Sequence, residues 1–529
     1  MRYSLFGFIG IAALLVACSQ TVSAPKNDDD SSEISSSSKK GTSSESKNGD
    51  KKSSSSTEDL DEDCVGEAGE PWDGTTAKDF ACGAGTKLSP YIILTAEQLA
   101  HLSFVVNSSD KAYQGKFFKL GADIKLNKGD VIDEKGALVG DSTKLHKWTP
   151  IGNSSVVFDG VFDGDGHSVS GMFINTTSTH NGLFGNSSGT IQNLTVENSW
   201  VYGGEYSAGI VGRSTGSVLS TKNLASVSGK EECIGGVIGS SYQKDYKTNS
   251  VIKKAVNMGF IAGEKNVGGV AGCATYVTVE DAENIGAIEG FGYVGGVFGG
   301  VGSSSKNETK NLRNSGNVVG KHFVGGIIGH CGGSVTLNDL ALNKTSSYSC
   351  YDFYPCGVIQ KAYNDGDVTG LRYVGGIAGE VCYGTIDNLV NKGNITGEGG
   401  TGGIVSSMSY TKSKLLYNVG NISGLTYVGG IVGYNQEGVT SSAYSTGKVD
   451  GDSLIGLMIG YNYNTTMADY YYLEQGDQEP FGLNNGGGVA KPKTADEMKS
   501  NDFAELLGDE FAYDSELNDG YPVLKWEME

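Results

Sequence analysis

A short glycine-rich pattern recurs along this chain and constrains its fold more than any other feature. The pattern is Gly-Gly-apolar-apolar-Gly, and most closing glycines are 27 residues apart. The closing positions are Gly185, Gly212, Gly239, Gly272, Gly299, Gly329, Gly379, Ser406 (in place of glycine), Gly433 and Gly460. The interval grows to 33 residues before Gly272, 30 before Gly329 and 50 before Gly379, which implies an insertion of about 23 residues in the last case. Because the insertions leave later repeats in register, each repeat is expected to contact mainly its neighbours.

A second column of residues has the same register. Asparagine occurs 15 residues before the closing glycine at Asn257, Asn284, Asn314, Asn364, Asn391 and Asn418, with Ser445 in the last repeat. The residues that follow fit Asn-x-Gly-x-Ile/Val-x-Gly, as in 284–290 and 418–424. The β-branched residue between polar or small neighbours is typical of a strand with one face inward.

These two columns predict an all-β fold, a parallel β-helix (solenoid) of about ten 27-residue coils. Equivalent strands would lie one above another at roughly 4.8 Å, so that stacked asparagines pair amide to amide. Glycine would be needed where φ is positive or where a side chain would crowd a corner. A β-sandwich remains an alternative, although the unbroken register favours stacked coils.

A stacked solenoid needs its two open ends covered, and both flanks contain short helical patterns. Thr95 is a suitable N-cap for an amphipathic helix beginning at 96–102, within an N-terminal cap and first coils at 64–180. Thr494 begins a second helical pattern that ends near Gly508 and is followed by a turn and strand at 518–524. We therefore expect small helical caps at both ends, with residues 476–529 as the C-terminal cap.

The first 18 residues have the character of an export signal. An apolar stretch from Leu5 to Ala17 follows Arg2 and is too short for a permanent membrane span. The sequence 15–18, Leu-Val-Ala-Cys, resembles the bacterial lipobox, which implies a lipoprotein signal peptide at 1–18 and lipidation (diacylglycerol and palmitate) of Cys18. A plain secretory signal is the alternative. Ser19 is not the aspartate that would suggest inner-membrane retention, so we expect a lipid-anchored, surface-exposed protein of the outer membrane.

Residues 19–63 consist almost entirely of Ser, Lys, Asp, Glu, Gly and Thr. Such a segment has too few apolar side chains to offset the entropy of ordering, which predicts a disordered Ser-rich linker between membrane and folded part. The whole chain of 529 residues has a formal net charge of -21. That charge repels phosphate backbones, so no nucleic-acid partner is expected.

Without Cys18, eight cysteines remain, an even number in an exported chain where disulfides are stable. The pairs closest in sequence are Cys64 with Cys82 and Cys350 with Cys356. Cys331 and Cys382 follow corresponding glycines of consecutive coils and are also candidates to meet, while Cys233 and Cys273 have no assigned partner. The connectivity is therefore open at this point.

The repeat itself resembles a known motif. Gly-Gly-Val-Phe-Gly at 295–299 and Gly-Gly-Ile-Val-Gly at 429–433 are similar to the GLUG motif of bacterial surface and secreted proteins. The resemblance covers roughly residues 150–475, with the regular repeats at 181–475, and implies a right-handed β-helix. Relatives with this motif include adhesin-like proteins and accessory regions of immunoglobulin A peptidases, but fold alone does not fix activity.

The segment 158–167, Phe-Asp-Gly-Val-Phe-Asp-Gly-Asp-Gly-His, concentrates carboxylates. Asp-Gly pairs are common in tight turns, which is the interpretation we favour. A calcium site is the second interpretation and an acid/base pair the third, but an EF-hand would need further oxygen ligands and a glutamate at its twelfth position. No cofactor or metal is otherwise expected, and no catalytic residue is assigned.

An aromatic column lies six residues before the closing glycine. Its members are Tyr206, Tyr293, Phe323, Tyr373 and Tyr427, and Cys233, Asn266, Gly400 and Leu454 interrupt it. The next residue is mainly Val or Ile and so points inward, which predicts that the aromatic side chains point outward. Such a column is a candidate surface for sugar rings. The alternative is a ladder that only stabilises the stacking of coils.

These features favour a cell-surface lipoprotein that acts in adhesion or in glycan or protein binding and has no catalytic activity. Its expected partners are the membrane, through the lipid, and a polysaccharide or another cell-surface ligand. A polysaccharide-degrading lyase or hydrolase is the alternative, because such enzymes use the same fold. However, only Arg213, Arg313 and Arg372 supply arginine in the solenoid, and the sequence contains no HExxH motif. A purely structural spacer is the third interpretation.

Overall fold

The computed structural model describes residues 69–529, except 109–110, 243–248, 303, 305, 333–349 and 351–354. Every described residue belongs to one compact unit, Leu60–Glu529. That unit is a right-handed parallel β-solenoid of about 13 turns with few helices, which confirms the predicted fold class. The signal peptide, Cys18 and the linker at 19–63 lie outside the described residues.

Three parallel sheets run along the solenoid. Sheet 1 contains β1 (Tyr91–Ile93), β2 (Phe117–Leu120), β3 (Ile124–Lys125), β4 (Val161–Asp163), β5 (Ser168–Ser170), β8 (Thr190–Glu197), β11 (Ser217–Asn223), β15 (Ser250–Asn257), β18 (Val277–Asn284), β21 (Glu308–Asn314), β25 (Gly357–Asn364), β29 (Gly384–Asn391), β33 (Lys412–Asn418), β37 (Val439–Ser445), β41 (Thr466–Leu473) and β43 (Ala490–Lys493). Sheet 2 contains β7 (Phe184–Ser187), β10 (Val211–Ser214), β14 (Ile238–Tyr242), β17 (Ala271–Thr275), β20 (Phe298–Val301), β24 (Ile328–Cys331), β28 (Ala378–Cys382), β32 (Val405–Ser409), β36 (Val432–Gln436), β40 (Ile459–Tyr463) and β42 (Phe481–Asn485). Sheet 3 contains β6 (Phe173–Asn175), β9 (Trp200–Gly203), β12 (Ser226–Gly229), β13 (Glu232–Gly235), β16 (Ile261–Gly268), β19 (Ile288–Gly295), β22 (Val318–Val319), β23 (His322–Gly325), β26 (Val368–Thr369), β27 (Arg372–Gly375), β30 (Ile395–Thr396), β31 (Gly399–Gly402), β34 (Ile422–Ser423), β35 (Thr426–Gly429), β38 (Val449–Asp450) and β39 (Ser453–Gly456).

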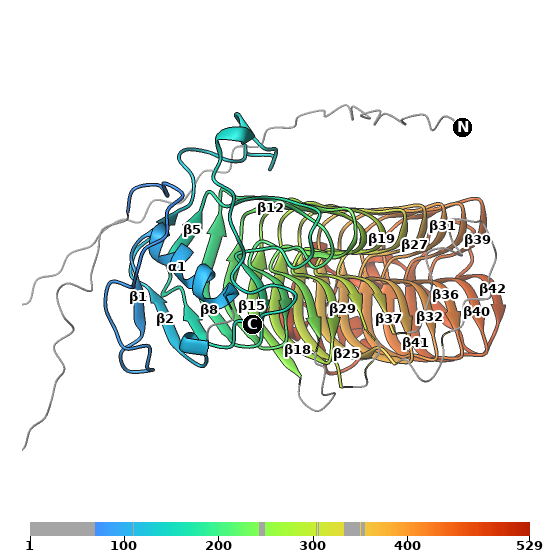
Figure 1. Cartoon of the computed structure of the whole chain (residues 1–529). Coiled ribbons are helices and arrows are strands. Elements are labelled where there is room, and N and C mark those ends of the chain that lie inside the picture. The colour runs from blue at the N-terminus through green and yellow to red at the C-terminus, as the bar shows by residue number, and fades with distance from the viewer. Residues whose placement is uncertain are drawn as a thin grey trace, which may run out of the picture. The chain divides into compact units, whose positions relative to one another are not determined.

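Each coil passes through sheet 1, sheet 3 and sheet 2 in that order, and the next coil repeats the path alongside it. In Figure 1 the colour runs in order from blue to red along the stack, as expected when coils contact their sequence neighbours. The predicted register is correct: Asn364 pairs with Asn391, and Val324 pairs with Val374. One continuous core of buried Val, Ile, Leu, Ala and Phe side chains fills the space between the sheets.

The asparagine column forms the predicted amide ladder. Asn314 Nδ2 donates to Asn364 Oδ1 over 2.7 Å, and Asn364 Nδ2 donates to Asn391 Oδ1 over 2.8 Å. Each amide also donates to the backbone oxygen two residues ahead, as Asn364 does to Gly366 over 2.8 Å. The same bonds link Asn257, Asn284 and Asn418 into the ladder, which begins one coil earlier than predicted, at Asn223. The ladder is buried, so its hydrogen bonds hold the coils in register without competition from water.

The repeated glycines are needed because neighbouring atoms approach closely. A Cβ on Gly326 would lie 2.1 Å from the Gly376 oxygen and 2.3 Å from Cγ of Asn364, so this glycine makes room for the asparagine ladder. Apart from Gly182 in the first repeat, with a φ of 152°, none of the glycines of these motifs has a φ in the left-handed region. The prediction that a side chain would crowd these corners is thus confirmed. The prediction that glycine is needed for a positive φ is wrong for nearly all of these positions.

Most of the residues other than glycine that have a left-handed φ fall instead on three other columns. The first lies within the strands of sheet 1 and comprises Asn193, Ser220, Lys254, Asp281, Asn311, Lys361, Asn388, Leu415, Ser442 and Asp469. The second comprises Tyr206, Cys233, Asn266, Tyr293, Phe323, Tyr373, Gly400, Tyr427 and Leu454, with φ from 52° to 65°. The third follows sheet 2 and comprises Tyr276, Tyr383, Tyr410, Glu437 and Asn464. The second column is the predicted aromatic column, so its side chains leave the backbone at a bend of the coil.

The disulfides differ from the pairs closest in sequence. Cys350 does not pair with Cys356, nor Cys331 with Cys382; the bonds are Cys331–Cys356, Cys350–Cys382 and Cys233–Cys273. Cys331 pairs in the sheet with Val381, so Cys382 is one residue further along and faces the opposite side of the strand. Cys82 is also disulfide-bonded, whereas Cys64 lies outside the described residues.

The N-terminal helix has the predicted start. Helix α1 (Ala96–Asn107) is capped by Thr95, whose hydroxyl accepts from Gln98 N in a capping box. Its buried residues Leu99, Leu102 and Val106 join the main core, and Figure 1 shows the helix at the N-terminal end of the stack beside β1 and β2. A 3₁₀ turn at Lys111–Tyr113 follows, and another lies at Ser142–Lys144. No helix among the described residues is long and apolar enough to cross a bilayer.

The C-terminal helices also form, but they pack against the outer face of sheet 1. They are α3 (Ala495–Met498), capped by Thr494, and α4 (Asn501–Leu507), which ends at Gly508. They are followed by the antiparallel pair β44 (Phe511–Ala512) and β45 (Val523–Leu524) and by 3₁₀ turns at Asn518–Gly520 and Lys525–Glu527. Phe503 and Leu507 pack on the tyrosines of β33, β37 and β41, namely Tyr417, Tyr444 and Tyr471. The Tyr417 hydroxyl donates to Glu527. This segment therefore covers the side of the later coils.

Candidate functional site: the outer seam

Two columns of side chains meet on the outside of the bend between sheet 3 and sheet 2. One is the aromatic column, six residues before the closing glycine, and the other is the residue directly after that glycine. They contact each other at several levels: the Arg213 guanidinium lies 5.9 Å from the Tyr206 ring centre, Cys233 bonds to Cys273, and the Tyr427 and Tyr434 rings are 6.2 Å apart. We call the surface formed by these two columns the seam.

The structure separates the five predicted aromatic residues into three groups along the seam. Tyr293, Phe323 and Tyr373 form a small cluster of their own, apart from the main core that contains the valines next to them. The rings of Phe323 and Tyr373 stack at 4.7 Å with an 8° angle, and Tyr293 and Phe323 lie 5.3 Å apart. Tyr293 and Phe323 are buried, so this middle group resembles a ladder that stabilises stacking. Tyr206 and Tyr427 lie at opposite ends of the seam.

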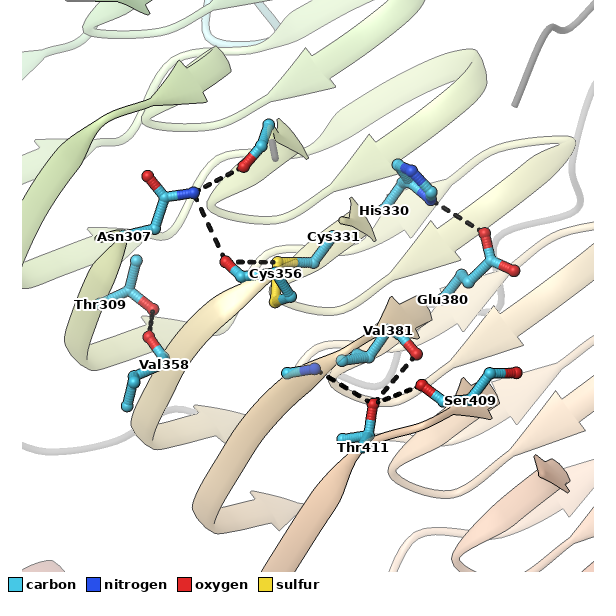
Figure 2. The surroundings of a disulfide bond; sticks show 12 residues. Asn307, Thr309, His330, Cys331, Cys356, Val358, Glu380, Val381, Ser409 and Thr411 are labelled. Atoms are coloured by element: carbon cyan, nitrogen blue, oxygen red, sulfur yellow. Dashed lines mark hydrogen bonds and ion pairs between the residues drawn. A yellow bond between two sulfur atoms is a disulfide. The ribbon is translucent and has the colours of Figure 1, made fainter. Parts of the chain in front are cut away.

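An imidazole and a carboxylate lie beside the middle group. Nδ1 of His330 is 3.0 Å from Oε2 of Glu380, as Figure 2 shows, and the two side chains are 12% and 3% exposed. The His330 ring is 5.1 Å from that of Tyr293. The Glu380 carboxylate also lies within 4.8 Å of the sulfurs of Cys350 and Cys382, but both sulfurs belong to a disulfide and are not thiolate ligands.

A tyrosine cluster occupies the C-terminal end of the seam. It consists of Tyr427, Tyr434 and Tyr461. The rings of Tyr434 and Tyr461 stack at 5.2 Å with a 15° angle, and the Tyr427 ring stands nearly perpendicular to both, at 83° and 84°. Tyr427 is 37% exposed, and exposed Tyr463 extends the same surface from the end of β40. Aromatic faces, edges and hydroxyls are thus available together on a rigid scaffold.

Sequence reasoning found only Tyr427 of this cluster. Tyr434 and Tyr461 are 27 residues apart and each directly follows a closing glycine, which is the signal that could have identified them. The Tyr434 hydroxyl donates to Gln436 over 3.1 Å, and Asn485 donates to the Tyr461 hydroxyl over 3.4 Å. Burial, followed by the neighbouring Tyr461, raises the pKa of Tyr434. Its phenol therefore stays a neutral hydrogen-bonding group at physiological pH.

The carboxylates of 158–167 have protein partners. Asp165 forms an ion pair with Lys119 at 2.8 Å, and Asp163 accepts from Gln192, from Asn193 and from the backbone N of Asp165. Those side-chain hydrogen bonds and Lys119 outweigh the effect of burial and lower the pKa of Asp163. The segment makes a tight turn, closed by His167 N and Gly164 O at 2.8 Å, with positive φ at Asp165 and Gly166. These φ values match a type I′ turn, as the turn interpretation expects.

No family model matches the chain. It is 30% identical over 184 residues to halomucin of Haloquadratum walsbyi, a match covering 34% of this chain and 2% of halomucin. It is 35% identical over 125 residues to a Gly-rich membrane protein of Evansella cellulosilytica, covering 23% of this chain and 12% of that protein. A crystal structure described as an immunoglobulin A1 protease of Bacteroides ovatus aligns at 17% identity and a TM-score of 0.29, over 84% of this chain and 95% of that one.

Proposed function

We propose that this protein is a lipid-anchored protein of the cell envelope whose solenoid binds an extracellular polysaccharide. The observation that carries this proposal is the tyrosine cluster, in which exposed Tyr427 stands perpendicular to the stacked pair Tyr434 and Tyr461. A sugar ring has an apolar face of C–H groups and a rim of hydroxyls. Tyrosine offers the matching combination of a flat apolar body and a polar tip, at little cost in side-chain entropy.

The surroundings of the cluster add hydrogen-bonding groups of the same kind. Gln436 and Asn485 already bond to tyrosine hydroxyls, and amides both donate to and accept from sugar hydroxyls. The scaffold is also rigid, because the cluster lies on β35, β36 and β40, which pair with neighbouring strands in register. Binding would therefore lose little free energy to ordering of the protein.

The expected result of a binding test is specific to this cluster. The full chain, solubilised in detergent, is expected to bind at least one polysaccharide of a neutral and acidic glycan panel. Replacing Tyr434 or Tyr461 by alanine should weaken that binding about tenfold, which corresponds to the loss of roughly 1.4 kcal/mol. Isothermal titration with the strongest ligand of the panel measures the change.

Tyr202→Ala is the matched control, because Tyr202 also stacks on a neighbouring ring, Trp200, at 5.9 Å, but lies outside the seam. This variant should bind as the unchanged protein does. Equal binding by the Tyr434→Ala protein would refute the assignment. Release of reducing or unsaturated sugar ends during incubation would instead favour the polysaccharide-degrading alternative.

The lipid anchor is the second part of the proposal. The Leu-Val-Ala-Cys sequence ending at Cys18 supports it, and one of the two relatives named above is described as a membrane protein. Labelled palmitate is expected to enter the unchanged chain and the control Ser19→Ala, but not the Cys18→Ala chain. Label in the Cys18→Ala chain would show that the lipobox interpretation is wrong.

A further inference from the structure

The N-terminal end of the seam contains a cation without a carboxylate partner. Arg213 in β10 is half-buried, and its guanidinium lies 5.9 Å from the Tyr206 ring centre and 5.8 Å from that of Tyr242. Among the described residues no carboxylate oxygen lies within 4.0 Å of Arg213, although the chain carries 61 acidic residues. A half-buried guanidinium of this kind suits a planar carboxylate, which it can bind through two parallel hydrogen bonds.

His180 belongs to the preceding coil and also contacts the Tyr206 ring. The two ring centres are 5.1 Å apart, and His180 is 7% exposed with a φ of 64°. Its Nδ1 is 2.7 Å from the Thr179 hydroxyl, whereas its Nε2 is buried without a hydrogen-bond partner in the described structure. Burial, with Arg213 as the smaller cause, lowers the pKa of His180 to about 4, so the ring is neutral at physiological pH. A buried ring nitrogen without a partner is costly in a folded protein unless a ligand completes it.

A hollow of about 530 Å³ lies next to His180. Its walls come from the end of α1, the loop at 147–153 and the segment 174–181, and His180 is one of the lining residues. The polar groups of the walls are amides, hydroxyls and the Lys147 ammonium, and no carboxylate lines it. Such a lining accommodates a sugar-sized polar molecule that is neutral or negatively charged.

We propose that this end of the seam is a subsite for a carboxylate-bearing sugar of the uronic-acid class. Arg213 binds the carboxylate, and the hollow that His180 helps to line holds the adjoining sugar. The inference rests on the proposed function in one respect, that the ligand of this solenoid is a polysaccharide. The inference adds that the polysaccharide is acidic and that Arg213 binds its carboxylate several coils away from the tyrosine cluster.

Trigalacturonate and its methyl ester separate the charge from the sugar, because esterification removes the carboxylate and keeps the ring. The full chain, titrated with each compound, is expected to bind the acid at least tenfold more tightly than the ester. Arg213→Gln should remove this preference. Arg313→Gln is the control, because Arg313 lies against Trp526 on sheet 1, with 5.8 Å between guanidinium and ring. Equal affinity for acid and ester, or an unchanged preference in the Arg213→Gln protein, would overturn the inference.

Two further measurements distinguish this subsite from the tyrosine cluster. The NMR signals of the His180 ring should shift on addition of trigalacturonate in the unchanged protein, and unchanged signals would contradict the role of the hollow. The Tyr434→Ala protein should keep its preference for the acid over the ester even where its binding of long polysaccharide is lost. Loss of polysaccharide binding with the acid preference intact would therefore concern the proposed function of the tyrosine cluster alone. Loss of the acid preference with polysaccharide binding intact would count against the subsite alone.

Discussion

Replacing Gly326 by alanine is expected to destabilise the solenoid by about 3 kcal/mol or more. The added Cβ would lie 2.1 Å from the oxygen of Gly376 in the next coil and 2.4 Å from Oδ1 of Asn364. Both neighbours are held in place, the first by the stacked backbone and the second by the amide ladder. The coil must therefore open, which weakens the ladder and the sheet together. Urea unfolding followed by circular dichroism measures the loss.

Gly399→Ala is the matched control within the same stack. Its nearest neighbour would be Cγ of Arg372 at 3.7 Å, an ordinary contact, and its φ is outside the left-handed region. Alanine there should leave stability unchanged or raise it by about 0.5 kcal/mol, because the unfolded chain loses conformational freedom. A Gly326→Ala protein as stable as the Gly399→Ala protein would show that close packing is not the reason for the repeated glycine.

Replacing Asn364 by leucine is expected to cost roughly 3–5 kcal/mol, because several buried polar groups lose their partners at once. Leucine has a similar volume, so the change tests hydrogen bonding more than cavity formation. Asn314 loses an acceptor for its Nδ2, Asn391 loses a donor to its Oδ1, and the Gly366 oxygen loses a donor. Denaturant unfolding of the purified chain gives the change in the free energy of unfolding.

Asn421→Leu is the control for the ladder, because Asn421 belongs to an exposed amide column, where its Nδ2 donates to Asn394 over 3.2 Å. Water replaces that bond, so the loss should stay within about 0.5 kcal/mol. Should both asparagine variants lose the same free energy, the buried ladder would have no special role. A local loss can also divide unfolding into two transitions, since coils contact only their neighbours.

The fold was accessible from the sequence because its interactions repeat. Each coil places the same residue type at the same height, so glycine at Gly326 and asparagine at Asn364 appear in the sequence as columns with one period. The capping threonines Thr95 and Thr494 were also recognisable, because their hydrogen bonds join residues only three positions apart.

The candidate site was less accessible because it depends on which columns meet across a bend. The aromatic column was visible in the sequence, but its partner column changes residue type in most coils: Arg213, Cys273, His330 and Glu380 occupy it before tyrosine repeats at Tyr434 and Tyr461. In the coils where the residue type changes, no repeat in the sequence marks the column. The disulfide connectivity was open in the sequence for a related reason, because Cys382 lies one residue beyond Val381, the sheet partner of Cys331, and so faces the opposite side of the sheet.

The sequence by itself determined the parallel solenoid, the register of its coils and the positions of its helix starts. Those properties follow from local patterns and from identical residues stacked on one another. Only the tertiary structure decided that the rings of Phe323 and Tyr373 stack on each other, while Tyr427 stands exposed beside Tyr434 and Tyr461. The same structure brought His180 beside Tyr206 and Arg213. Contacts across the bend depend on distances between different strands of the coil, and the spacing of residues along the chain does not contain those distances.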